Sequence, residues 1–187
     1  MMDVAPWHLR AAMHALSVGD VIACPTEAVW GLSCAASSQR GVMRLLELKQ
    51  RDWRKGLILV ASSLEQLLPY IELPSSNALK RATATWPGPA TWVFPASPTV
   101  PLWLTGEHDT IAVRVSAHPV LRALCNRWGG PLVSTSANPT GREPARGITE
   151  VRLYFKEAIE VLVPGALGGL AKPTTIRDVA TGHILRR

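Results

Sequence analysis

The stretch PLVSTSANPTG, residues 131–141, decides how this chain can fold. Its apolar part, with Leu132–Thr135, has the composition of a short strand, and the hydroxyl, carboxamide and turn-forming residues that follow would end that strand. Open α/β folds bind ligands at the carboxyl ends of their strands. Ser, Thr and Asn offer hydrogen bonds without adding negative charge, which suits an anion or a nucleotide. Because the same residue types are common in turns, this stretch alone leaves a binding site and a plain capped turn as equal alternatives.

Strands and helices are both expected on either side of this stretch, from the period of the apolar residues and from the Pro, Ser and Gly residues at their ends. The helices are expected at 6–18, from a cap at Ser37 or Ser38 through Leu48, and at 64–70, 76–85, 119–128 and 149–155. The strands are expected at 21–24, 57–60, 91–94, 111–115, 132–135, 159–163, 174–177 and 183–185, with residues 30–34 leading into the second helix. Since some neighbouring strands have no helix between them, we expect an α/β fold with a mixed sheet and covering helices.

The composition indicates one domain, residues 1–187, with a sizeable core, because 47% of the residues are hydrophobic. The formal net charge of +6 suits a polyanionic partner such as nucleic acid or the phosphates of a nucleotide. No apolar run is long enough to cross a bilayer, and Asp3, His8 and Arg10 interrupt the region where a signal peptide would be continuous. We therefore expect a cytoplasmic protein with no membrane contact.

The cysteines and histidines indicate neither a disulfide framework nor a metal site. The three cysteines are odd in number and have no CxxC pair, and Cys24 lies in an apolar run where a buried thiol is favoured over a nucleophile. The histidines have no HxxxH or HxH spacing, so no protein-made metal site is expected. Neither GxxxxGK[ST] nor GxGxxG occurs, so any ATP would be bound without a P-loop or a dinucleotide-binding turn.

Cations are concentrated after the second expected helix. Lys49, Arg51, Arg54 and Lys55 place four cations within seven positions, where they could form an anion cradle or complement the end of the helix. Arg114 lies inside an apolar strand and needs a carboxylate partner, which could come from the protein or from a ligand.

Five blocks of residues occur in an order that is specific to one known family. The blocks are PTEAVWGL at 25–32, KQR at 49–51, WPGPAT at 86–91, AVRV at 112–115 with HP at 118–119, and STSAN at 134–138 with Gly141. With them the chain closely resembles the YrdC/TsaC family from about residue 20 to residue 180. The resemblance implies a single YrdC-like domain whose twisted open sheet has a concave, basic face.

The activity that the resemblance implies is threonylcarbamoyl-AMP synthesis. L-threonine, bicarbonate and ATP would give L-threonylcarbamoyl-AMP and pyrophosphate. Proteins of a threonylcarbamoyl-transferase complex would then pass the group to the adenosine next to the tRNA anticodon. The expected partners are therefore those three substrates, the transferase proteins, and tRNA or double-stranded RNA. Mg²⁺ is expected to arrive with ATP rather than in a protein cage.

The resemblance also implies roles for individual residues. Lys49 and Arg51 match the family's basic pair and would be catalytic by neutralising phosphate charge. The residues expected to bind ATP are that pair together with Ser134, Ser136, Asn138, Thr175 and Arg177. Thr26 and Arg114 are expected to bind L-threonine, Arg114 through the substrate carboxylate.

Two departures and two other functions are to be weighed beside this activity. Residues 55–60 lack the histidine that longer family members carry in the threonine pocket, and the chain lacks their additional C-terminal domain, so local loops or a partner would have to replace any lid.

A non-catalytic RNA-binding factor in ribosome maturation would use the same basic charge. A carbamoyl-transfer module of hydrogenase maturation proteins would be accompanied by zinc-finger and acylphosphatase-like neighbours, which do not occur in this sequence.

Overall fold

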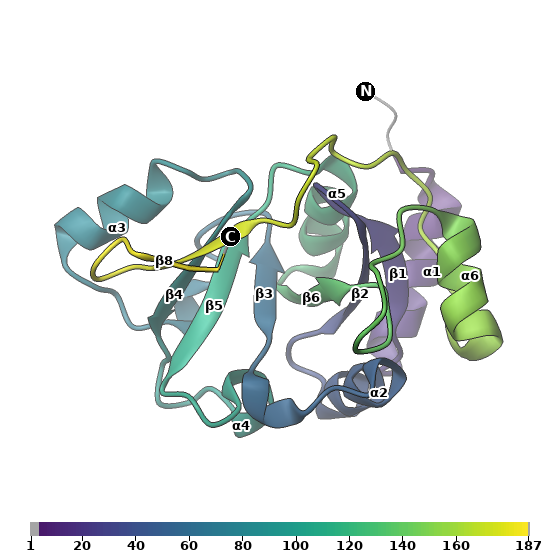
Figure 1. Cartoon of the computed structure of the whole chain (residues 1–187), viewed down its shortest axis with the longest axis horizontal. Helices are drawn as coiled ribbons and strands as arrows, with labels where there is room; N and C mark the ends of the chain where they lie inside the picture. Colours follow the sequence, from purple (N-terminus) through teal and green to yellow (C-terminus); the bar gives the residue numbers. More distant parts are fainter. Residues whose placement is uncertain (1–3, 187) are drawn as a thin grey trace.

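The computed structural model describes residues 4–186 and has an open mixed sheet at its centre (Figure 1). The eight strands lie in the order β1-β2-β6-β3-β5-β4-β7-β8. Their bounds are β1 (Ile22–Pro25), β2 (Trp30–Ala35), β3 (Ile58–Ala61), β4 (Ala90–Pro95), β5 (Thr110–Val115), β6 (Leu132–Ser136), β7 (Thr175–Asp178) and β8 (Ile184–Arg186). The pairs β3/β5 and β4/β7 are parallel and the other neighbours are antiparallel, which confirms the mixed sheet predicted from the sequence.

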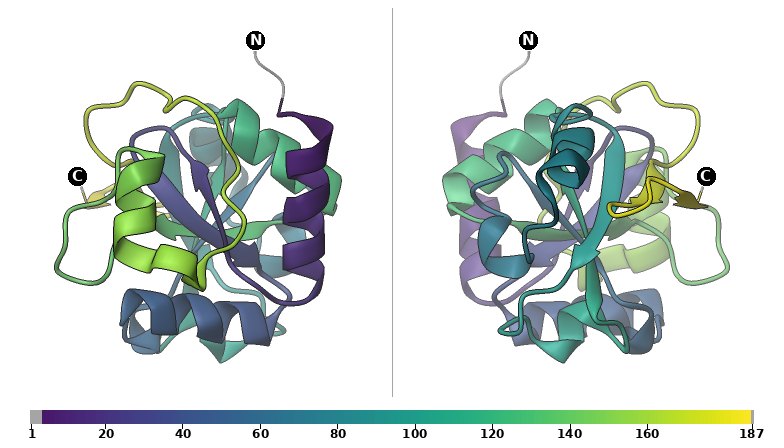
Figure 2. Two further views of the ribbon diagram at one scale, coloured as in Figure 1. Left: turned by 90° about the vertical axis from the view of Figure 1, so that its right-hand side faces the viewer. Right: turned by 90° about the vertical axis from the view of Figure 1, so that its left-hand side faces the viewer.

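Helices cover both sides of this sheet. Their bounds are α1 (Pro6–Ser17), α2 (Gln39–Lys49), α3 (Ser76–Thr83), α4 (Leu102–Thr105), α5 (Pro119–Trp128) and α6 (Ile148–Phe155), with 3₁₀ turns η1 (Trp53–Lys55), η2 (Leu68–Tyr70) and η3 (Lys156–Ala158). The helices α1 and α5 lie together on one side of the sheet, and α6 lies on the opposite side (Figure 2). No helix in the described part of the chain is long and apolar enough to cross a membrane.

The helix ends follow the residues that the sequence offers. Ser38 caps α2 by accepting a hydrogen bond from the Gly41 amide, and a proline begins both α1 and α5. Gly129 ends α5 in the left-handed conformation that glycine adopts without strain.

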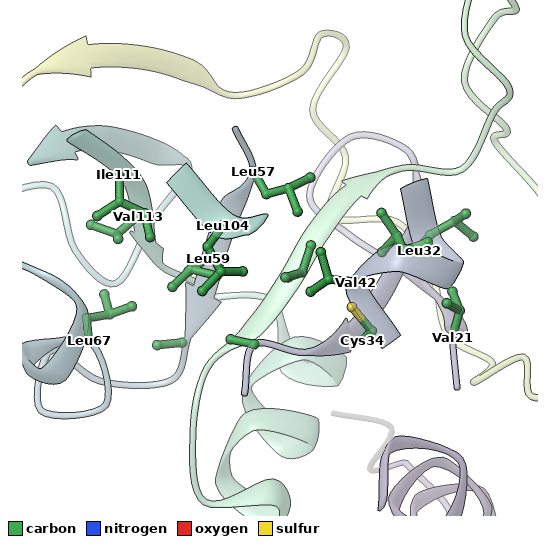
Figure 3. Packing of buried hydrophobic residues seen from close by; sticks show 14 of the residues in the cluster. Val21, Leu32, Cys34, Val42, Leu57, Leu59, Leu67, Leu104, Ile111 and Val113 are labelled. Atoms are coloured by element: carbon green, nitrogen blue, oxygen red, sulfur yellow. The ribbon is translucent and has the colours of Figure 1, made fainter. Parts of the chain in front are cut away.

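The central strand β3 is buried on both of its faces. Leu59 packs into the larger of two hydrophobic clusters, part of which Figure 3 shows together with Val113 and Leu104, while the next residue, Val60, packs into the cluster beneath α1 and α5. Burying a side chain of this size stabilises the fold by about 1.5–3 kcal/mol. The apolar run at 57–60 is therefore explained by a strand with a core on each side, as predicted.

Two predicted elements are wrong. Residues 64–70 contain only the 3₁₀ turn η2 at their end, because Pro69 lacks an amide donor and prevents an α-helix from continuing there. Residues 159–163 form a single bridge from Leu162 to Ala23 rather than a strand, and Pro164 directly after them limits further pairing. Residues 30–34 lead into α2 as expected, and they do so as the buried strand β2, which was not predicted.

The buried thiol predicted for Cys24 is confirmed. The side chain is fully buried, and this burial raises the pKa of the thiol to about 12. Cys24 therefore stays protonated at neutral pH and fills space in the core beneath α1 and α5.

Candidate active site

A cavity of about 420 Å³ lies over the central strands, where the end of β6 meets the start of β3. Strand β8 is the edge strand beside β7 and brings Arg186 to the same cavity. The charged side chains of the lining are Lys49, Arg51, Arg114 and Arg186, and no acidic side chain of residues 4–186 lines it. The cavity is therefore suited to anions.

One side of the cavity, the Lys49 side, consists of Lys49, Arg51, Ser134, Ser136 and Asn138. Lys49 is the last residue of α2 and only 3% exposed. Its Nζ donates to the carbonyl oxygens of Ser136 at 2.5 Å and Asn138 at 2.7 Å, and lies 3.5 Å from Asn138 Oδ1. These partners are all neutral, so burial, with a smaller effect of Arg51, lowers the pKa of Lys49 to about 8.

The loop after β6 is held by its own side chains as well as by Lys49. Asn138 Nδ2 donates to the carbonyl oxygens of Pro139 at 3.0 Å and Arg142 at 2.7 Å, so the carboxamide that was expected to bind ATP is used within the loop. The hydroxyls of Ser134 and Ser136 also line the cavity, and neither bonds to another described residue. They are therefore donors at the end of β6 that can reach a ligand.

Arg51 and Arg186 place two further cations near each other. Arg51 Nη2 donates to the Gly56 carbonyl at 3.0 Å, while its buried Nε has no hydrogen-bond partner among the described residues. Burial lowers the pKa of Arg51, and the charge of Arg186 lowers it further. Two guanidinium groups that line one cavity and repel each other are stabilised by an anion bound to both.

The other side, the Arg114 side, is lined by Thr26, Arg114 and Thr174, while Glu27 and Ser116 are buried behind Arg114 without lining the cavity. Arg114 is 5% exposed, and its Nη2 lies 3.3 Å from Glu27 Oε2. Burial lowers the pKa of the Arg114 guanidinium, the Glu27 carboxylate opposes this effect, and the charge of Arg186 adds to it. The sequence left open whether the carboxylate partner of Arg114 belongs to the protein or to a ligand. The structure shows that the protein supplies one, Glu27, and that Arg114 also lines the cavity.

Thr26 lies just after β1 and lines the cavity. The other residues that were predicted to bind ATP or L-threonine also line it, with two exceptions that are described below. Its Oγ1 donates to the Val29 carbonyl at 2.8 Å, so the hydroxyl offers a ligand its oxygen lone pairs rather than its proton. Gly31 in β2 allows this close fit, since a Cβ there would lie 2.9 Å from Thr26 Cγ2 and 3.1 Å from the Thr135 carbonyl.

The two exceptions are Thr175 and Arg177, which the structure does not bring to the cavity. Thr174 lines it instead, because neighbouring residues in an extended segment have side chains on opposite faces. The Arg177 guanidinium lies 5.9 Å from the centre of the Trp92 ring. The sequence reasoning also missed Arg186, although a basic residue after the apolar pair Ile184-Leu185 was a readable signal.

The residues 4–186 contain no group of three or more His, Cys, Asp or Glu side chains that could hold a metal ion. The side-chain oxygen atoms in the cavity lining that could coordinate a metal ion belong to hydroxyl and carboxamide groups rather than to carboxylates. A cation would therefore have to be carried by an anionic ligand.

Comparisons with known proteins agree with this geometry. The family profile Sua5_yciO_yrdC, described as Telomere recombination, matches residues 14–187. A Halorhodospira halophila protein named threonylcarbamoyl-AMP synthase is 53% identical over 182 residues, covering 97% of this chain and 95% of that protein.

Two solved structures share the fold. P. abyssi Sua5 complexed with L-threonine has a TM-score of 0.90 and 31% identity, and the match covers 98% of this chain and 54% of the Sua5 chain. E. coli YciO has a TM-score of 0.82 and 25% identity over 96% of this chain and 88% of that chain. The chain thus spans about half the length of Sua5 and most of YciO.

Proposed function

The chain belongs to the Sua5/YciO/YrdC family, and from this membership we propose that it is a threonylcarbamoyl-AMP synthase. It joins L-threonine, bicarbonate and ATP into L-threonylcarbamoyl-AMP and pyrophosphate. The structural observation that carries the proposal is a cavity with four cationic side chains and no acidic one among its described lining residues.

The reaction brings two anions together. The amine of threonine and bicarbonate give a carbamate with loss of water, and a carbamate oxygen then attacks the α-phosphorus of ATP while pyrophosphate leaves. The attacking group is already anionic, so the site needs cations and alignment more than a strong general base. The four cations of the cavity provide the first, and the rigid loop after β6 provides the second.

We assign the nucleotide to the Lys49 side. Arg51 and Arg186 both line the cavity and repel each other, and bound phosphates would reduce this repulsion. Ser134 and Ser136 have hydroxyls free to donate, whereas Lys49 acts by holding the loop and by its charge. Asn138 contributes by shaping that loop.

We assign L-threonine to the Arg114 side. Arg114 receives the substrate carboxylate through the guanidinium N–H groups that Glu27 and Thr174 leave free. Thr26 offers a hydroxyl oxygen to the substrate amine or hydroxyl. The carbamate formed on this amine then points toward the nucleotide on the other side.

We further propose how the substrates and partners are supplied. Mg²⁺ enters with the triphosphate of ATP, since the described lining residues offer no carboxylate to hold it. The domain is a single YrdC-like unit that works in the cytoplasm, where ATP and tRNA are present. Its formal net charge of +6 suits contact with tRNA or double-stranded RNA, and its product is passed to threonylcarbamoyl-transferase proteins.

The test is pyrophosphate release from ATP by the purified protein, with mass spectrometry of the adenylate. We expect release to require both L-threonine and bicarbonate, and to proceed without tRNA. Release that ignores either small substrate would contradict the proposal. Tight tRNA binding without any pyrophosphate would support the RNA-binding alternative instead.

A further inference from the structure

A buried carboxylate stands behind Arg114 without lining the cavity itself. Glu27 is 6% exposed, and its Oε2 lies 3.3 Å from Arg114 Nη2. Its other oxygen, Oε1, accepts a hydrogen bond of 2.6 Å from Ser116 Oγ. Oε1 is therefore held by a hydrogen bond from the turn after β5, whereas Oε2, which has no hydrogen-bond partner among the described residues, is held by its ion pair with Arg114 of β5.

Ser116 is itself held in place. It is fully buried, and its amide donates to the Ala61 carbonyl at 3.0 Å. Its Oγ also accepts a hydrogen bond of 3.0 Å from the His118 amide. The Ser116 hydroxyl thus has a fixed position from which it can direct the Glu27 carboxylate.

The far end of the Arg114 guanidinium is anchored separately. Nη1 donates to Thr174 Oγ1 at 2.8 Å, and Thr174 Oγ1 lies 3.3 Å from Thr91 Oγ1. The buried Nε has no hydrogen-bond partner among the described residues. A guanidinium has five N–H donors in one plane, so fixing its two terminal nitrogens sets the direction in which the remaining donors point.

The main chain of Glu27 is fixed as well. The amide of Leu170 donates to the Glu27 carbonyl at 2.9 Å, and the amide of Gly168 donates to the Thr26 carbonyl at 3.0 Å. A Cβ at Gly168 would lie only 2.8 Å from Glu27 Cα, so the two segments are packed without space for a side chain. Glu27 can therefore act as a rigid support.

We propose that Glu27 and Ser116 are positioning residues for L-threonine, which aim the Arg114 guanidinium at the substrate carboxylate without touching the substrate. This inference rests on the proposed function, because it takes L-threonine as the ligand of Arg114. It assigns part of the threonine affinity to a hydroxyl that lies outside the cavity.

The test compares Ser116→Ala and Glu27→Gln with the wild type in steady-state kinetics. We expect Ser116→Ala to raise the KM for L-threonine roughly fivefold, because a hydrogen bond to a charged group is lost. Glu27→Gln should raise it about tenfold or more, because the ion pair is lost as well. In both variants the KM for ATP, and kcat at saturating threonine, should stay within about twofold of the wild type, since only the threonine-binding step uses the direction of Arg114.

The matched control is Ser33→Ala, which removes another fully buried serine hydroxyl, one in β2 outside the cavity lining. It should leave both KM values unchanged. If Glu27→Gln does not fold, Ser116→Ala decides the matter, because it leaves both charges in place. Circular dichroism and thermal melting identify a variant that does not fold.

Two results would overturn the inference. One is an unchanged or lowered threonine KM in both variants, and the other is an equal rise of the KM values for threonine and ATP. The first would reduce Glu27 to a counter-charge, and the second would show a general loosening of the cavity. A wild-type protein without threonine-dependent pyrophosphate release would instead overturn the proposed function, which separates the two failures.

Discussion

Lys49 and Arg114 are cations on opposite sides of one cavity, and both are almost fully buried, with 3% and 5% exposure. Lys49 is held by carbonyl and carboxamide oxygens, which are neutral, whereas Arg114 is paired with the carboxylate of Glu27. The Lys49 side therefore keeps its full positive charge, and the Arg114 side is largely neutralised. A side with uncompensated charge suits a polyphosphate, and a compensated, well-oriented guanidinium suits a single carboxylate.

The largest expected effect comes from removing a positive charge on the Lys49 side. Lys49→Ala or Arg51→Ala should lower adenylate formation by about a hundredfold, as expected for the loss of one pre-positioned charge stabiliser. The rate of pyrophosphate release measures this, with Lys80→Ala, an exposed lysine in α3, as the matched control. Turnover like that of the wild type in both variants, with native circular dichroism, would remove these residues from the site.

The second-largest expected effect comes from removing the guanidinium on the Arg114 side. Arg114→Ala should weaken L-threonine binding by more than about tenfold, while ATP binding changes little, because only the carboxylate loses its bidentate partner. Calorimetric titration with each ligand measures the two affinities. Equal losses of both would place Arg114 in the structure rather than in the threonine site.

The free energy of unfolding separates the structural role of Arg114 from its role in binding L-threonine. Arg114→Ala should also lower the free energy of unfolding by about 3–5 kcal/mol, because it leaves the Glu27 carboxylate buried without a partner. The double variant with Glu27→Gln should recover much of this loss in chemical denaturation but none of the threonine affinity. Recovery of both properties together would count against Arg114 as a ligand.

A third effect uses the pKa of Lys49, which burial lowers to about 8. Below that pH the ammonium is charged, and as the pH rises through it the free protein loses this charge. Affinity for a non-hydrolysable ATP analogue should therefore fall by about tenfold or more between pH 7.5 and pH 9.5. Lys49→Met should abolish this dependence. The same pH dependence in that variant would assign the titration to another group.

The smallest effect concerns the register of β7. Thr174→Val should raise the KM for L-threonine by a few fold, since it removes the hydrogen bond to Arg114 Nη1, while Thr175→Val and Arg177→Ala should change it by less than about twofold. Kinetics of the three variants side by side measure this. A larger rise of the KM for ATP in Thr175→Val or Arg177→Ala than in Thr174→Val would restore the predicted role of Thr175 and Arg177 in ATP binding.

Residues in short, contiguous motifs could be predicted from the sequence. Arg51, Ser134 and Ser136 line the cavity because each sits in or beside a strand or helix end whose place the apolar pattern indicates. The mixed sheet and most of its strands could be predicted for the same reason.

The rest depends on contacts between distant segments. Glu27 meets Arg114 and Ser116 only once β5 has been placed near the end of β1, and Arg186 reaches the cavity only because β8 turns back beside β7. The internal use of the Asn138 carboxamide depends on loop geometry that residue type does not determine. Spacing in the sequence carries no information on such pairings.

The most direct measurement is a crystal structure with a non-hydrolysable ATP analogue and L-threonine bound together. The account predicts the phosphates against Arg51, Arg186 and the Ser134 and Ser136 hydroxyls, and the threonine carboxylate on Arg114, with its amine turned toward the α-phosphate. Phosphates bound on Arg114, or either ligand bound away from the cavity, would contradict it.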